Sequence, residues 1–141
     1  MKARVKWVEA MTFVGEADSG HGVVMDAAPD IGGRDLGVRP MELMLIGMGG
    51  CTAIDVVLIL KRGREPVSGC VVELTAERAA ADPKVFTKIH VHYKVAGSGL
   101  APAKVERAVR LSAEKYCSAT AMLARTATVT DDFEVIDGPA V

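Results

Sequence analysis

Apolar residues dominate one long stretch of the chain, from Pro40 to Leu60, in which only Glu42 and Asp55 carry charge. They fall on every face of a 3.6-residue helix, which predicts a helix that other protein surrounds on nearly all sides. Pro40 suits the first helical position and Glu42 the first turn, where the helix dipole favours an anion. Three glycines, two carboxylates and the lack of flanking aromatic residues argue against a membrane span of the same length.

Alternation of apolar and polar residues predicts strands on both sides of this helix. Before it, the stretch from Ala3 to Val14 alternates, Glu16 to Gly20 has turn chemistry, and Val23 to Met25 returns, so a hairpin is expected. After it, strands are expected from Val71 to Arg78, from Phe86 to Val95, and from Thr126 to Ile136 with a charged break at Asp131 and Asp132.

A second helix is expected to begin at Pro102 and to end near Cys117, so the order of elements is β-β-α-β-β-α-β. The chain has 141 residues and no internal repeat, which fits a single domain, residues 1–141, of the α+β class with antiparallel sheet. One small sheet and one partner helix cannot cover the long apolar helix. The pattern therefore favours a homodimer that shares its core.

Composition and charge remove several classes of function. Half of the residues are hydrophobic, only 4% are aromatic and seven are methionine, which indicates an aliphatic core of adaptable shape. The net charge is −1 and the basic residues are scattered, so no nucleic acid and no membrane surface is expected as a partner. The N-terminus begins as an amphipathic strand rather than a signal peptide, which predicts a cytoplasmic protein. In that reducing compartment, three cysteines indicate catalysis or burial rather than structural disulfides.

Cys51 follows Gly49 and Gly50 directly inside the long helix. Two adjacent glycines weaken a helix by about 1 kcal/mol each and permit a kink. If the helix breaks there, Cys51 begins its second half, near unpaired N–H groups that stabilise a thiolate. Asp55 lies one turn later on the same face and needs a partner, which is either an arginine near the thiol or a fixed hydrogen bond or salt bridge across the dimer.

Two arginines and two histidines are weaker candidates. Arg34 and Arg39 lie in the glycine-rich loop just before the long helix and could orient an anionic or peroxidic substrate, although solvated loop charges explain them equally well. His90 and His92 share the polar face of one strand, where flanking lysines and the lack of a carboxylate of the same parity disfavour a metal. No Cys or His pair has zinc-finger spacing, which also disfavours a metal site.

Cys117 is the second cysteine that stands out, whereas Cys70 is interpreted as a packing residue. If the two helices pack with the Cα atoms of Cys51 and Cys117 about 4.4–6.8 Å apart, the pair could form a disulfide. That would fit a thiol peroxidase, in which a thiolate becomes a sulfenic acid and then condenses with a resolving thiol. Cys51 should react first, because Cys117 is expected at a helix C-terminus, where the dipole disfavours an anion. Two buried cysteines that only fill space explain the same pair.

The order and spacing of these motifs resemble the OsmC/Ohr family, the osmotically inducible and organic hydroperoxide resistance proteins. The resemblance covers nearly the whole chain. It includes the segments Pro40-Met41-Glu42-Leu43, Gly49-Gly50-Cys51, Gly99-Leu100 and Tyr116-Cys117-Ser118. The run Gly-Gly-Cys-Thr-Ala-Ile-Asp is most similar to the signature of the family's less characterised third branch. The resemblance implies an OsmC-like fold, with antiparallel sheets wrapped around central helices in an intertwined homodimer.

The resemblance implies no cofactor, whether metal, haem or flavin. It also implies roles for individual residues. Cys51 matches the peroxidatic cysteine and Cys117 the resolving one, in a family that reduces organic hydroperoxides with dithiols such as lipoylated proteins. In the hydroperoxidase branches a glutamate follows the helix-opening proline and orients an arginine; here Glu42 comes one residue later, and Arg34 and Arg39 are the candidates for the arginine. The expected function is thus a thiol-dependent peroxidase of the antioxidant stress response. The alternative is a non-enzymatic dimeric module that binds a small hydrophobic ligand.

Overall fold

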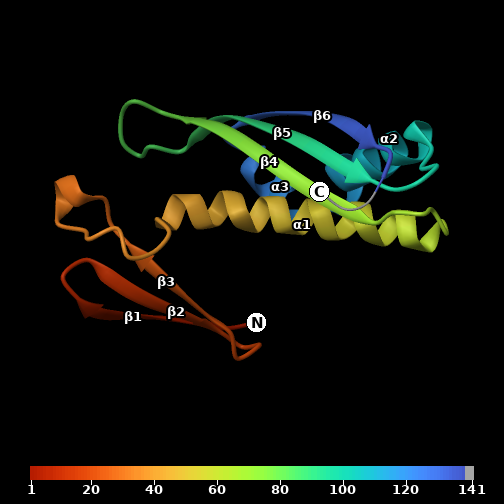
Figure 1. Cartoon of the computed structure of the whole chain (residues 1–141). Coiled ribbons are helices and arrows are strands. Elements are labelled where there is room, and N and C mark those ends of the chain that lie inside the picture. Colours follow the sequence, from red (N-terminus) through yellow and green to blue (C-terminus); the bar gives the residue numbers. More distant parts are fainter. Residues whose placement is uncertain (139–141) are drawn as a thin grey trace. The chain divides into compact units, whose positions relative to one another are not determined.

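The computed structural model describes residues 1–138 and shows an α+β chain (Figure 1). Its elements are β1 (Ala3–Glu9), β2 (Thr12–Ala17), β3 (Gly22–Asp26), the 3-10 turn η1 (Pro29–Ile31), α1 (Pro40–Arg62), β4 (Gly69–Arg78), β5 (Phe86–Ala96), α2 (Pro102–Leu111), the π-helical turn η2 (Ser112–Tyr116), α3 (Ser118–Leu123) and β6 (Thr128–Ile136). They form two compact units, Met1–Ile46 and the chain from Gly47 onward. The prediction of a single domain over residues 1–141 stays a prediction.

The N-terminal unit contains an antiparallel sheet in the order β1-β2-β3. The hairpin of β2 and β3 confirms the predicted turn between them. The single strand predicted from Ala3 to Val14 is wrong, because the chain reverses at Ala10 and Met11 and makes two strands of it. Ala10 has a left-handed φ of 45°, and Trp7 Nε1 donates a hydrogen bond to its carbonyl at 2.8 Å. Trp7 lies opposite Phe13 across the turn. Because apolar residues continue on both sides of the turn, the alternation in the sequence does not reveal it.

The loop between β3 and α1 is held by one buried carboxylate. Asp26 is 2% exposed and accepts hydrogen bonds from the backbone N–H groups of Ala27, Arg34 and Leu36. Burial by itself would raise the pKa of Asp26, but these three donors and Thr12 lower it overall. The loop that carries the candidate arginines is thus anchored at several points of its backbone.

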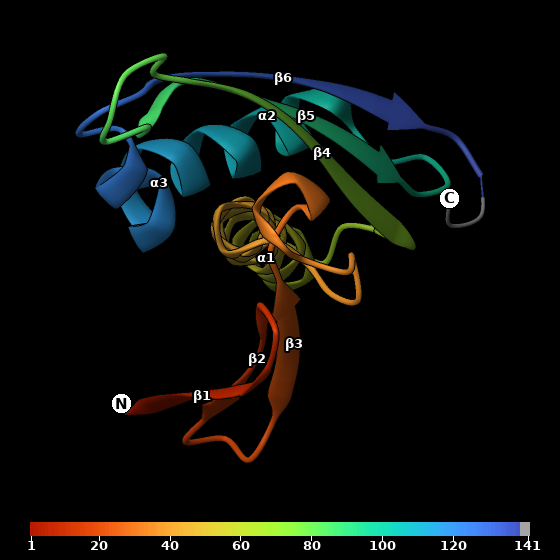
Figure 2. The same cartoon turned by 90° about the vertical axis from the view of Figure 1, so that its left-hand side faces the viewer.

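The second unit contains a sheet in the order β4-β5-β6. The pair β4 and β5 is antiparallel, as predicted. The pair β5 and β6 is parallel, so the sheet is antiparallel in only one of its two pairs. The reason lies in the connection, because α2, η2 and α3 lie between these strands in the chain and a crossover of that length joins parallel neighbours. Figure 2 shows all three α-helices on the same face of this sheet.

Helix α1 begins at Pro40, as predicted, and ends two residues beyond the predicted Leu60. It runs without interruption through Gly49 and Gly50, so the condition stated for Cys51, a helix break just before it, is not met. A Cβ atom on Gly49 would lie 2.7 Å from Leu74 Cδ1, which shows that this glycine permits a close approach of α1 and β4. The glycine therefore serves packing rather than bending.

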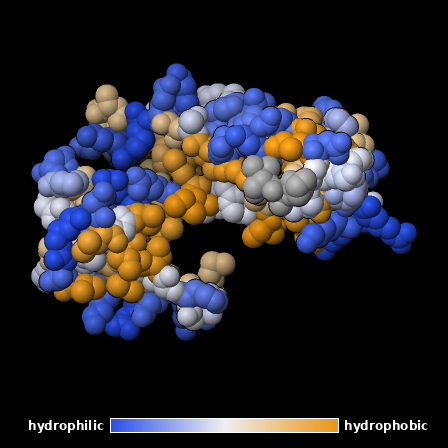
Figure 3. Space-filling view, viewed as in Figure 1, coloured by the Kyte–Doolittle hydropathy of each residue, from blue (hydrophilic) through white to orange (hydrophobic). Residues whose placement is uncertain are grey.

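One stripe of α1 is buried within the chain, consisting of Met48, Thr52, Val56 and Leu60. Elsewhere on the helix Ile54 is 68% exposed and Leu58 41%, and Figure 3 shows that apolar side chains remain at the surface. By length and composition alone α1 could cross a membrane, a property that it shares with core helices of soluble proteins. This chain by itself does not enclose the helix on all sides.

The core of the second unit lies between α1, α2 and the inner face of the sheet. It includes Ile89, Val91, Tyr93 and Val95 of β5 together with Val105 and Val109 of α2. Strand β6 is continuous through Asp131 and Asp132, so the predicted charged break is wrong. In the parallel register Asp132 lies opposite His92, and this pairing gives its charge a partner on the outer face.

Candidate active site

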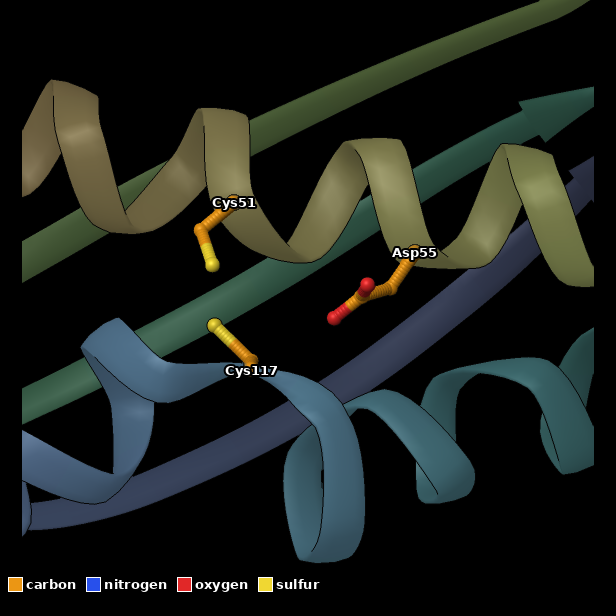
Figure 4. A group of neighbouring side chains, drawn as sticks. All are labelled: Cys51, Asp55 and Cys117. Atoms are coloured by element: carbon orange, nitrogen blue, oxygen red, sulfur yellow. The ribbon is translucent and has the colours of Figure 1, made fainter.

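Cys51, Asp55 and Cys117 converge in the second unit (Figure 4). Cys51 and Asp55 project from α1 four residues apart, and Cys117 reaches them from the junction of η2 and α3. The two Sγ atoms and a carboxylate oxygen of Asp55 all lie within 4.8 Å of one another. Cys51 and Asp55 are half-buried, and Cys117 is 3% exposed. The sequence-derived proximity of Asp55 to Cys51 is thus present, and Cys117 joins them.

Cys117 is placed by two short helical segments. Its backbone N–H donates to the carbonyl of Ser112 at 2.9 Å and closes the π-helical turn η2. The same residue is the N-cap of α3, where its Sγ accepts a hydrogen bond from the backbone N–H of Thr120 at 3.4 Å. The predicted setting at a helix C-terminus alone is therefore incomplete, because a helix that the sequence pattern did not indicate begins at this cysteine.

Burial raises the pKa of the Cys117 thiol above its usual value. The hydrogen bonds from Thr120 lower it in part, and the neighbouring Cys51 raises it again. The balance keeps Cys117 protonated at neutral pH. That Cys51 reacts before Cys117 stays a prediction. On the side of Cys117, burial rather than the end of a helix disfavours the anion.

A buried chain of hydroxyl groups ends on Asp55. Ser112 Oγ donates to Asp55 Oδ2 at 3.1 Å, and Thr52 Oγ1 lies 2.8 Å from Ser112 Oγ and 2.6 Å from the Tyr93 hydroxyl. Each hydroxyl has one proton, so the donation to the carboxylate fixes the direction from Tyr93 through Thr52 to Ser112. Burial raises the pKa of Tyr93 to about 12, which keeps its hydroxyl a donor. The structure thus gives Asp55 a fixed hydrogen bond within the chain, whereas the partner expected across the dimer stays a prediction.

Glu42, Arg39 and Arg34 make their contacts in the N-terminal unit. Glu42 accepts from the backbone N–H of Arg39 at 2.9 Å and from its guanidinium at 3.1 Å, and these bonds lower the pKa of Glu42. Arg39 also pairs with Asp35 at 3.2 Å. Arg34 donates to Glu9 at 2.6 Å, which raises the pKa of its guanidinium. Both cysteines belong to the other unit, so the expected approach of an arginine to Cys51 stays a prediction.

Sequence reasoning missed Thr52, Ser112 and Tyr93 as members of the site. Their signal was available, because Thr52 and Ser112 are polar residues in otherwise apolar helical stripes and Tyr93 lies on the inward parity of β5. A polar residue at a core position requires a hydrogen-bonding partner. Three of them in separate elements could have indicated one shared network.

Comparison with known proteins identifies the family. Residues 32–131 match the family model described as OsmC-like protein. The chain belongs to the OsmC-like protein family. Over 136 residues it is 49% identical to Protein YhfA of Escherichia coli strain K12, which covers 96% of this chain and 98% of YhfA. The resemblance seen in the sequence is thus confirmed.

Solved structures with the same fold support this assignment. A hypothetical protein from Aquifex aeolicus VF5 is 28% identical and superimposes with a TM-score of 0.85, over 97% of this chain and 96% of that one. An organic hydroperoxide resistance protein OsmC from Legionella pneumophila is 15% identical, with a TM-score of 0.69 over 96% and 98% of the two chains. The second likeness establishes a shared fold.

Proposed function

We propose that this OsmC-like protein is a thiol-dependent peroxidase that reduces organic hydroperoxides through Cys51 and Cys117. The observation that carries the proposal is the convergence of the two sulfur atoms from separate elements, within 4.8 Å of each other. Supporting it, the similar Legionella pneumophila protein is described as an organic hydroperoxide resistance protein and a predicted redox protein. Packing alone does not require two thiols to face one another as Figure 4 shows.

The proposed reaction has two steps at the cysteines. The Cys51 thiolate attacks the terminal oxygen of ROOH, the O–O bond breaks, and the alkoxide takes a proton and leaves as ROH, so that Cys51 becomes a sulfenic acid. Cys117 then gives up its proton and attacks the Cys51 sulfur. The S–O bond breaks, hydroxide leaves as water with that proton, and a disulfide remains. A dithiol reductant supplies two electrons by thiol–disulfide exchange and restores both thiols.

The two cysteines should give different products when each is replaced. After one equivalent of cumene hydroperoxide, the wild type should contain a Cys51–Cys117 disulfide by peptide mass mapping. Cys117→Ser should accumulate a dimedone-reactive sulfenic acid on Cys51, whereas Cys51→Ser should not react, because the protonated Cys117 cannot begin the cycle. Cys70→Ser is the matched control and should behave as the wild type. Equal oxidation of Cys51 and Cys117, or no thiol loss with any hydroperoxide, would contradict the proposal.

An arginine of the N-terminal unit is proposed to favour the Cys51 thiolate and to orient the peroxide. Arg39 and Arg34 are the candidates, and each is already ordered by a carboxylate partner. Arg39→Ala or Arg34→Ala should move the pH dependence of Cys51 alkylation to higher pH, because a nearby cation stabilises the anionic form. If neither substitution alters that dependence, the loop has no such role.

We further propose a cytoplasmic homodimer that is reduced by a dithiol, such as a lipoylated protein. A second function has one observation in its favour. A groove of about 390 Å³ on α1 is lined by Ile54, Leu58 and Cys70 and is mostly apolar, as a site for a small hydrophobic ligand would be. A non-enzymatic binding module should take up such a ligand without loss of thiols. The thiol assay with cumene hydroperoxide distinguishes the two functions.

A further inference from the structure

The cluster of Cys51, Cys117 and Asp55 has the chemistry of a metal-binding site. Thiolate sulfur and carboxylate oxygen are ligands of Zn²⁺, at about 2.3 Å and 2.0–2.2 Å respectively. Ligands around one tetrahedral ion therefore lie roughly 3–4 Å apart. The three atoms here lie within 4.8 Å of one another before any ion is bound, so small rotations of the side chains would bring them to that spacing.

Two of the three ligand atoms are already held by hydrogen-bond donors from behind. Ser112 Oγ donates to Asp55 Oδ2 at 3.1 Å, and the backbone N–H of Thr120 donates to Cys117 Sγ at 3.4 Å. Outer donors of this kind orient the ligands of protein metal sites and strengthen binding. Ser112 is itself fixed by Thr52 and Tyr93, so the carboxylate is supported by a chain of three buried side chains.

The charge balance points the same way. Among the described residues of the second unit, 47–138, Asp55 forms no ion pair with a lysine, arginine or histidine. Deprotonation of the two neighbouring thiols would add two negative charges beside it. A divalent cation would compensate this charge locally, as bound cations do in thiolate sites.

We propose that Cys51, Cys117 and Asp55 together bind one thiophilic divalent cation of the Zn²⁺ class. Each thiol releases its proton to solvent on binding, and no electrons are transferred. Three protein ligands leave the fourth tetrahedral position to water. The site does not depend on peroxidase activity, but it needs both sulfurs reduced, so the cation and an oxidant compete for Cys51.

Cobalt(II) is a suitable probe, because its absorption reports both thiolate ligands and tetrahedral geometry. Reduced full-length protein should bind one Co²⁺ per chain with sulfur-to-cobalt charge-transfer absorption, and Zn²⁺ should displace it. Cys51→Ser and Cys117→Ser should each weaken binding at least tenfold, and Asp55→Ala should do the same while it leaves the charge-transfer band in place. Ser112→Ala should weaken binding about tenfold through the carboxylate alone. Cys70→Ser should bind as the wild type does.

A second readout uses the protein's own control thiol. Zn²⁺ should slow alkylation of Cys51 and Cys117 in the wild type and leave alkylation of Cys70 unchanged. The proposal is overturned if reduced protein binds no Co²⁺, if the Cys51→Ser, Cys117→Ser double variant binds it unchanged, or if binding is lost only when His90 and His92 are both replaced by alanine. None of these measurements involves a hydroperoxide. A failure here therefore leaves the proposed peroxidase standing, and the converse also holds.

Discussion

At the scale of single residues, the site depends on uncharged polar side chains that are buried, namely the hydroxyl groups of Thr52, Ser112 and Tyr93. Thr52 and Ser112 are each fully buried, and each has both a donor and an acceptor within 3.1 Å. A buried hydroxyl that loses one partner keeps the cost of its lost hydration. The chain from Tyr93 to Asp55 is thus a stability element as well as a support for the carboxylate.

Removing different members of this chain should have unequal effects. Ser112→Ala takes a donor from Asp55 and the acceptor from Thr52, and we expect a loss of about 1–3 kcal/mol in the free energy of unfolding. Tyr93→Phe removes only the terminal hydroxyl and should cost about 0.5–1.5 kcal/mol. Urea unfolding measures both, with Ser98→Ala at an exposed position as the control. Equal losses for Ser112→Ala and Ser98→Ala would show that the network contributes no stability.

Part of the site was within reach of the sequence. The four-residue spacing predicted that Asp55 shares a face with Cys51, because that relation is local to one helix. The approach of Cys117 could be stated only as a condition, since it depends on how the η2 turn and α3 place one atom. The polar character of Ser112 in an apolar stripe was a signal that it needed a partner, but the identity of that partner, Asp55, depends on tertiary packing. Hydrogen bonds between distant segments produce no periodic pattern in the sequence from which they could be predicted.

At the scale of elements, Gly49 sets the distance between α1 and β4. An alanine in a helix interior normally stabilises the fold by about 1 kcal/mol relative to glycine. At position 49 its methyl group would instead lie 2.7 Å from Leu74 Cδ1, which is a steric clash. Gly50 offers the comparison, because a Cβ atom there meets nothing within 4 Å in this chain. Of the two adjacent glycines, only Gly49 is thus required by a close contact within this chain.

A double-mutant cycle can separate these reasons. Gly49→Ala should lower the free energy of unfolding relative to Gly50→Ala. Leu74→Ala should relieve the steric clash at Gly49→Ala, with a coupling energy of about 0.5–3 kcal/mol measured by urea unfolding. Gly50→Ala combined with Leu74→Ala should be additive within about 0.5 kcal/mol. Additivity at Gly49 as well would contradict the close approach.

The stability contributed by the pairing of β5 and β6 should depend on pH. Hydrogen bonds to Asp132 and then to Glu134 raise the pKa of His92 above 6.5, while His92 lowers the pKa of Asp132 below 3.8. A raised histidine pKa contributes stability below 6.5 that is lost as the pH rises through the folded-state pKa. A lowered aspartate pKa contributes above 3.8 and is lost as the pH falls. The pair should therefore stabilise the sheet most between these two values.

The measurement compares unfolding of the wild type and His92→Gln. The difference in their free energies of unfolding should be larger at about pH 5.5 than at about pH 9. Asp132→Asn should remove most of the same pH dependence, since Asp132 is the main cause of the shift. A difference that grows with pH would show that the pair does not act as described.

Element boundaries show where the sequence pattern was sufficient. The start of α1 and the antiparallel pair of β4 and β5 follow from capping and alternation, which are local. The reversal at Ala10 was missed because the run of apolar residues continues across it. The parallel pairing of β6 was missed because strand direction depends on how a crossover returns to the sheet.

At the scale of the whole molecule, much apolar surface in this chain remains uncovered. Every residue of β1 is exposed, including Trp7 at 63%, and Ile54 on α1 is 68% exposed. Soluble monomers seldom leave so many large apolar side chains in contact with water. The finding is consistent with the proposed homodimer.

Sedimentation equilibrium at micromolar concentration should show a dimer, with an interface of about 2,000 Å² or more. Ile54→Lys should weaken it by burying a charge at the interface, whereas Ala103→Lys on the exposed side of α2 should not. A stable, folded wild-type monomer would refute the proposal.

The double position of Cys117, as a thiol and as the N-cap of α3, links chemistry to local dynamics. The Thr120 amide proton is held by the sulfur itself. Any new bond at that sulfur changes the acceptor and so loosens or tightens the first turn of the helix. Amide hydrogen exchange at Thr120 should therefore differ between reduced and oxidised protein, with faster exchange in the disulfide form. The conformation of α3, where Met122 is 73% exposed, would then depend on the redox state of Cys117.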